Sequence, residues 1–229
     1  MTTRRERIRH DTIEEIKSTA WRQIGEAGAS GLSLRWIARE MGMTAPGLYR
    51  YYKDRDALVT ALLTDAFEAF AVALEAGRDS AAAGDFAGRF REMSRAYFRW
   101  GRENPQKYIL LFGSPIQGYV FAEELIPVAQ KSFFVLVGVA AEAYAAGKLT
   151  GEVTALKMPT PLKVQYDALK KMGVPFAGVV IQSALSAWAM IHGITSLYLQ
   201  NYLTGMLQNS VGAFADHEIE KMIQTLGME

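Results

Sequence analysis

The sequence has no cysteine and only three histidines, His10, His192 and His217, among 229 residues. Without cysteine, disulfide scaffolds, thiolate zinc sites and cysteine nucleophiles are excluded. Three scattered histidines do not indicate a metal site, and we predict neither a metal nor a cofactor. The first sixteen residues, MTTRRERIRHDTIEEI, lack the apolar stretch of a signal peptide. We therefore expect a cytoplasmic protein.

Signals for β-strands are also scarce, because strict alternation of apolar and polar residues is rare in this chain. Half of the residues are hydrophobic and 21% are charged, which is typical of a folded chain rather than a disordered one. Glycine and proline fall mostly between long stretches with helical spacing. We predict an all-α protein. The expected helices cover residues 12–28, 33–41, 45–52, 55–77, 85–103, a short segment from 105, 121–146, 162–172, 175–207 and 216–226, with a polar loop at 147–160.

Helix-capping residues mark several of these boundaries. Asp11 or Thr12 can cap the first helix, and Ser33, Thr44 and Asp54 precede the second, third and fourth. The second and third helices are short and are separated by a turn that contains glycine. This order predicts a helix-turn-helix, whose second helix would enter the major groove of DNA.

The third helix is expected to have two different faces. At 100° per residue, Leu48, Tyr51 and Tyr52 fall broadly on one side and can pack on the first two helices. The other side, which can face DNA, carries Ala45, Pro46, Tyr49 and Arg50. Tyrosine and arginine reach phosphates, and small apolar side chains touch a thymine methyl group.

Charge is distributed unevenly along the chain. Residues 1–56 hold 11 Lys or Arg against 8 Asp or Glu, whereas residues 57–229 hold 14 against 16. An N-terminal part with excess positive charge favours an anionic partner. The start of the fourth helix, flanked by Lys53 and Arg55, favours a phosphate. The basic stretch with Arg4, Arg5, Arg7 and Arg9 fits a contact with an anionic partner or a merely solvated terminus, and the sequence leaves both open.

The pattern resembles the DNA-binding domain of the TetR family of transcriptional regulators over roughly residues 10–60. The matching residues are Ala20, Ile37-Ala38, Gly42, Leu48-Tyr49, Tyr52, Arg55 and Ala57-Leu58. The resemblance implies a DNA-binding domain at 1–56 and an effector-binding and dimerisation domain at 57–229. It also implies contacts to operator DNA by Arg35, Thr44, Ala45, Pro46, Tyr49, Arg50, Tyr51, Lys53 and Arg55. Among these, Arg35 would read a base edge, and Ala45 and Pro46 would make apolar base contacts.

The C-terminal half contains no Asp, Glu, Lys or Arg between residues 172 and 215. That length could span a membrane. Polar residues within it, such as Gln182, His192 and Asn201, instead favour a helix buried in its own domain and against a second copy, and we predict no membrane span. Trp188 and His192-Gly193 resemble the C-terminal domain of the Trp-His-Gly branch of the family. That resemblance implies a homodimer through the helices at about 176–205 and 216–226.

A small effector is the second partner that the resemblance implies. The candidate effector-binding residues are Trp100, Tyr108, Phe112, Gln117, Phe134, Trp188 and His192. Each aromatic residue could equally belong to the core, but the scarcity of charge favours an apolar or aromatic effector. The predicted function is a repressor that such an effector releases from its operator. The alternative is a constitutive DNA-binding protein without an effector. An enzyme is not expected, since no catalytic triad, Glu-x-x-His pair or phosphate loop is found.

Overall fold

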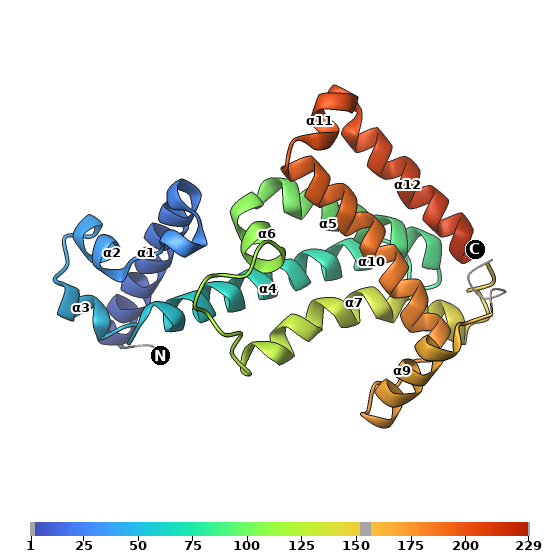
Figure 1. Ribbon diagram of the computed structural model, residues 1–229, viewed down its shortest axis with the longest axis horizontal. Coiled ribbons are helices and arrows are strands. Elements are labelled where there is room, and N and C mark those ends of the chain that lie inside the picture. The colour runs from blue at the N-terminus through green and yellow to red at the C-terminus, as the bar shows by residue number, and fades with distance from the viewer. Residues whose placement is uncertain (1–2, 152–156, 229) are drawn as a thin grey trace. The chain divides into compact units, whose positions relative to one another are not determined.

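The computed structural model describes residues 3–151 and 157–228, which form helices and loops without a β-strand (Figure 1). The predicted all-α class is confirmed. Two compact units divide the chain. Unit 1 comprises residues 1–67 and 104–128, and unit 2 comprises residues 68–103 and 129–229. Each unit is described by itself below.

Unit 1 contains the predicted helix-turn-helix. Its elements are α1 (Arg4–Ala27), η1 (Ala29–Gly31), α2 (Leu34–Glu40), α3 (Ala45–Tyr49), the first part of α4 (Arg55–Asp79) and α6 (Pro105–Phe112). The Ser33 hydroxyl accepts the N–H of Trp36, and the Thr44 hydroxyl accepts the N–H of Gly47. The Asp54 carboxylate accepts the N–H of Ala57 at 2.7 Å. All three predicted caps are therefore confirmed.

The first helix begins eight residues before its predicted start. It starts at Arg4, with Thr3 as the cap, and the prediction of Asp11 or Thr12 as the cap was wrong. The Thr3 hydroxyl accepts the N–H of Glu6, and the Glu6 carboxylate accepts the N–H of Thr3 at 2.7 Å. This reciprocal capping box satisfies two backbone donors, and its hydrogen bonds lower the pKa of Glu6. Thr12 lies within the helix, where its hydroxyl donates to the Ile8 carbonyl oxygen.

The core of unit 1 forms where the short helices meet α1 and α4. Its fully buried side chains are Ile16, Ala20, Ile37, Leu48, Leu58, Val59, Leu62 and Ala66. Between α2 and α3, Gly42 adopts a positive φ of 64°, a conformation that is costly for a side chain with a Cβ. The N–H of Met43 then returns to the Ala38 carbonyl oxygen at 2.8 Å. This turn fixes the direction in which α3 leaves α2.

Unit 2 is built around α5 (Phe86–Glu103), which packs on α10 (Gly178–Leu199) and α12 (Val211–Leu226). Its other elements are the rest of α4, most of α7 (Leu125–Ala145), α9 (Thr160–Lys171), α11 (Tyr202–Leu207) and η2 (Gln208–Ser210). A Cβ placed on Gly77 of α4 would lie 2.6 Å from the Cβ of Ala96 and 2.7 Å from the carbonyl oxygen of Glu92. Glycine therefore permits α4 and α5 to approach closely.

The predicted C-terminal helices differ from the observed ones in their boundaries. The long stretch at 175–207 is broken, because α10 ends at Leu199 and Asn201 adopts a φ of 62° before α11 begins. The last helix starts at Val211 rather than at residue 216. In the predicted loop at 147–160, residues 152–156 lie outside the described residues, and α9 already begins at Thr160.

Three helices, α4, α7 and α10, are long and apolar enough to cross a membrane by length and composition alone. In their most apolar windows, 50%, 33% and 44% of the residues are buried within the protein. Along α10, Gln182 accepts a hydrogen bond from the Tyr166 hydroxyl at 2.7 Å, and Ser183 and Thr195 are fully buried. Polar side chains of this kind suit a protein interior, so a membrane-free protein remains our prediction.

Candidate nucleic-acid interface

The exposed face of α3 is the feature on which a DNA-binding site depends. Leu48 is fully buried and Tyr52 is 9% exposed, so these two side chains anchor the segment to the core. Burial raises the pKa of the Tyr52 hydroxyl. Pro46, Tyr49 and Arg50 are exposed, with Tyr49 at 44%. Leu48 and Tyr52 face inward and Pro46, Tyr49 and Arg50 face outward, as predicted. The predicted helix at 45–52 ends at Tyr49, however, so Tyr51 and Tyr52 follow α3 and Tyr51 is only half-buried.

The remaining candidates on α2 and at the start of α3 surround this face. Arg35 is exposed on α2, Thr44 is exposed at the cap of α3, and Ala45 is half-buried. On the neighbouring side, Arg22 of α1 lies over the ring of Trp36 and pairs with Glu40 at 3.2 Å. This contact joins α1 to α2 and fixes the position of the helix that carries Arg35.

At the start of α4 the structure adds contacts that the sequence did not reveal. Lys53 is exposed, but the Arg55 guanidinium donates to the backbone oxygen of Gln117 at 2.8 Å. Its Nε also lies 3.4 Å from the Asp56 carboxylate. Asp54 already places a carboxylate on the first N–H groups of the helix, where a phosphate was expected. Phosphate contacts by Lys53 and Arg55 thus remain predictions, and Arg55 has an internal role as well.

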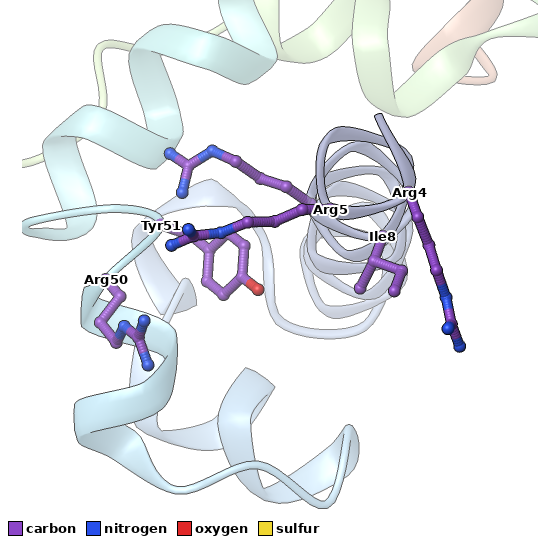
Figure 2. Close-up of a pocket in the computed structure, with 6 residues that line it drawn as sticks. Arg4, Arg5, Ile8, Arg50 and Tyr51 are labelled. Atoms are coloured by element: carbon purple, nitrogen blue, oxygen red, sulfur yellow. The ribbon is translucent and has the colours of Figure 1, made fainter. Parts of the chain in front are cut away.

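A basic groove lies between the first turns of α1 and the segment that follows α3 (Figure 2). It has a volume of about 450 Å³ and is lined by Arg4, Arg5, Ile8, Arg9, Arg50 and Tyr51. The guanidinium of Arg9 lies 5.4 Å from the centroid of the Tyr51 ring, within cation–π distance. Of the residues that line the groove, four are arginines and none is acidic. The predicted phosphate ligand Tyr51 is therefore half-buried beside a cluster of positive charge.

The candidate effector residues fall in both units. In unit 1, Tyr108 is buried with its ring centroid 5.0 Å from that of Phe112, and Gln117 is exposed. In unit 2, Trp100 is buried against Phe70, with centroids 4.9 Å apart.

On α7, Phe134 is 41% exposed and lies beside Phe133 and Phe176. A cavity of about 280 Å³ between α4 and α5 includes Trp100, Arg99 and Glu103 in its lining. Of the seven candidates, Trp100 lines this cavity.

Trp188 and His192 belong to a partly buried hydrogen-bonded group in unit 2. The Trp188 indole N–H donates to the Tyr97 hydroxyl oxygen at 3.2 Å, and that hydroxyl lies 3.1 Å from Nδ1 of His192. Nε2 of His192 lies 3.3 Å from the Ser196 hydroxyl. Tyr97 is fully buried, and burial lowers the pKa of His192. The sequence pattern of Trp188 and His192 did not reveal that Tyr97 of α5 connects them.

Comparisons with known proteins agree with this arrangement. Residues 16–62 match the model described as bacterial regulatory proteins, tetR family, and residues 90–222 match the tetracyclin repressor-like, C-terminal domain. HTH-type transcriptional regulators Rv1816 of Mycobacterium tuberculosis and Mb1846 of Mycobacterium bovis are each 30% identical over 226 residues, which cover 95% of this chain and of each relative.

Solved structures give the same result. The crystal structure of the regulatory protein SCO4313 is 34% identical, with a TM-score of 0.79 over 96% of this chain and 99% of that one. FadR from Bacillus subtilis, solved in complex with stearoyl-CoA, is 13% identical with a TM-score of 0.61 over 94% of this chain and 99% of that one, and it shares the fold alone. With one family model covering more than half of the chain and another covering the helix-turn-helix, this protein belongs to the TetR family of helix-turn-helix transcriptional regulators.

Proposed function

We propose that this transcriptional regulator is a homodimeric repressor that a small apolar or aromatic effector releases from its operator. The observation that carries the DNA-binding part is the face of α3, where Pro46, Tyr49 and Arg50 are exposed above the buried Leu48. A short helix held in this way can enter a major groove. Family membership makes the chain a DNA-binding regulator and not an enzyme. We place it in the cytoplasm, where bacterial DNA is found.

The proposed DNA interface extends from α2 to the start of α4. Tyr49, Tyr51 and the cations at Lys53 and Arg55 contact phosphates, while Arg35 contacts a base edge. The complete set comprises Arg35, Thr44, Ala45, Pro46, Tyr49, Arg50, Tyr51, Lys53 and Arg55. The exposure of Arg35, Thr44, Pro46, Tyr49, Arg50 and Lys53 and the excess positive charge of residues 1–56 support this set.

A second copy is proposed to pack on α10 and α12. Ala189 is exposed on α10, and a Cβ placed on Gly193 would meet no other atom within 4 Å. Leu197, one turn further along, is 43% exposed. Small residues beside an exposed leucine allow a partner helix to approach closely. A two-fold dimer would place the two copies of α3 about one DNA turn apart, ~34–36 Å.

The effector is proposed to bind in the C-terminal body, which we assign to the Trp-His-Gly branch. Support comes from the aromatic side chains of its interior and from the hydrogen-bonded group of Trp188, Tyr97 and His192. FadR, which has the same fold, holds stearoyl-CoA. An effector releases DNA only if it binds the two conformations of the dimer with different affinities.

The test is fluorescence anisotropy with the purified full chain and the DNA upstream of its own gene. Scrambled DNA serves as the control, and each titration is repeated at several salt concentrations. We expect selective binding that weakens steeply as salt rises, because phosphate contacts release counterions. A thermal-shift screen with apolar and aromatic compounds then follows, since a ligand that binds the folded state raises Tm.

The outcomes separate the two parts of the proposal. Failure to bind any DNA, including genomic fragments enriched by selection, would overturn the DNA-binding interface. Selective binding that no compound in the screen weakens would favour a constitutive DNA-binding protein. Sedimentation of the free protein as a monomer at micromolar concentration would contradict the proposed homodimer.

A further inference from the structure

The first two turns of α1 lie outside the core of unit 1. Residues 3–10 are all exposed, Ile8 is 55% exposed, and Ile16 is the first fully buried residue of the helix. These turns therefore gain little from burial. They nevertheless form a regular helix, stabilised by the capping box of Thr3 and Glu6. Because this segment adds little to the core and is ordered by its own cap, we look for its role in its exposed side chains.

The positive charges of these turns lie where they do not stabilise the helix of the free protein. Arg4, Arg5 and Arg7 lie in the first turn and just after it, where the helix dipole is positive and arginine is unfavourable. Ion pairs of unit 1 within the described residues use Lys17, Arg22 and Arg55, so no carboxylate there neutralises Arg4 or Arg5. The positive charge is thus concentrated and left available to an anion.

The groove shows where that anion would lie. Arg5 extends from α1 toward Tyr51, on the side where Arg50 follows α3, whereas Arg4 extends away from them on the other side of α1 (Figure 2). Contact with the Tyr51 ring restricts the Arg9 guanidinium, which reduces the entropy that Arg9 would lose on binding. Arginine side chains that line one groove suit the oxygens of a phosphate. Ile8 adds an apolar surface beside them.

We propose that this groove binds a backbone phosphate of operator DNA, next to the stretch that α3 reads. This inference rests on the proposed function and extends it, because α1 then becomes a second phosphate-binding element beside the helix-turn-helix. Arg50 directly follows α3, so a duplex with α3 in its major groove has its backbone within reach of the groove. Phosphate contacts carry no base information, so the contribution is independent of sequence.

The experiment measures operator affinity of the purified chain at four KCl concentrations by fluorescence anisotropy. The test variant is Arg5→Ala/Arg9→Ala, and the matched control is Lys170→Ala/Lys171→Ala, which removes two exposed cations at the end of α9. We expect the test variant to bind roughly tenfold more weakly. The slope of log affinity against log salt should fall by about 0.9 for each lost phosphate contact. The control variant should match the wild type in both quantities.

Two further results are expected if a phosphate is bound. Operator and scrambled DNA should lose affinity by the same factor, and Arg5→Lys/Arg9→Lys should restore most of the salt slope. Thermal melting by circular dichroism confirms that each variant is folded. If the alanine variant has lost helix, Arg5→Gln/Arg9→Gln replaces it, because glutamine removes the charge but keeps more of the side chain that packs beside Tyr51.

Each outcome decides between the two proposals. An unchanged affinity and salt slope in the folded double variant would overturn the phosphate groove while the DNA-binding function stands. An equal loss in the lysine control would show that only net charge matters, which also overturns the groove. Failure of the wild type to bind any DNA would overturn the proposed function, and the groove with it.

Discussion

The arginines of α5 and those at the start of α1 occupy long helices but have different neighbours. In α5, the Arg89 guanidinium is 8% exposed, pairs with Glu142 of α7 and donates to the Ala83 carbonyl oxygen at 3.2 Å. In the same helix, Arg91 is held by Glu220 of α12 at 2.9 Å. These arginines connect helices of unit 2 to one another.

At the start of α1 the same residue type faces outward. Arg4 and Arg5 are exposed and line a groove without a carboxylate. A buried arginine that loses its carboxylate destabilises the fold, whereas an exposed cluster of like charge slightly destabilises it and remains available to an anionic partner. Arginine content alone therefore does not predict DNA binding. The carboxylates within reach of each guanidinium decide its role.

Breaking the ion pair of the buried Arg89 in α5 should have the largest effect. Glu142→Ala leaves the Arg89 guanidinium buried without its carboxylate, and we expect a loss of about 2 kcal/mol in the free energy of unfolding. Urea denaturation followed by circular dichroism measures it. Glu220→Ala is the matched control, because its partner Arg91 is 29% exposed. That loss should stay below about 1 kcal/mol. Equal losses in both variants would contradict the distinction between a buried and a partly exposed guanidinium.

Removing an exposed tyrosine of unit 1 should lower the affinity for DNA and leave the stability of the fold unchanged. Tyr49→Ala removes the 44% exposed side chain of α3, and we expect roughly tenfold weaker operator binding with unchanged Tm. The control is Tyr144→Ala, which removes a similarly exposed tyrosine, at 47%, from α7. Anisotropy titrations measure both. Equal operator affinity in the two variants would place α3 outside the interface.

The turn of the helix-turn-helix should be sensitive to backbone strain. Gly42→Ala forces a Cβ into a φ of 64°, at a cost of roughly 1–2 kcal/mol in stability. Gly205→Ala is the control, because that glycine lies in α11, has open space around it and does not adopt a positive φ. Differential scanning calorimetry of both variants tests this. A neutral Gly42→Ala would mean that the turn rearranges freely.

Much of unit 1 could be predicted from the sequence, because the signals that mark its helices are local. Ser33, Thr44 and Asp54 lie next to the helices that they cap, so each was found at its position. The early start of α1 was also readable, since Thr3 and Glu6 have the spacing of a capping box. The basic residues before residue 10 indicate a charged terminus and do not by themselves predict a helix there.

Contacts between distant parts of the chain could not be predicted in the same way. Arg55 and Gln117 are 62 positions apart, and no pattern around either residue indicates that the guanidinium meets that carbonyl oxygen. Tyr97 likewise joins Trp188 and His192 only because α5 packs on α10. The break at Asn201 interrupts an apolar stretch that periodicity alone reads as continuous. Packing and backbone conformation, rather than local propensity, determine all three.

The smallest expected effect concerns the partly buried group around His192. Burial lowers the pKa of His192 below its ordinary value of 6.5, so the unfolded chain takes up a proton at a higher pH than the folded protein does. Stability that is complete above pH 6.5 is therefore lost as pH falls through the lower, folded pKa. His192→Gln keeps a polar side chain beside Tyr97 and Ser196 but does not titrate. Urea midpoints between pH 7 and pH 5 should decline less in this variant than in the wild type. A parallel decline in both proteins would show that protonation of His192 does not couple to folding.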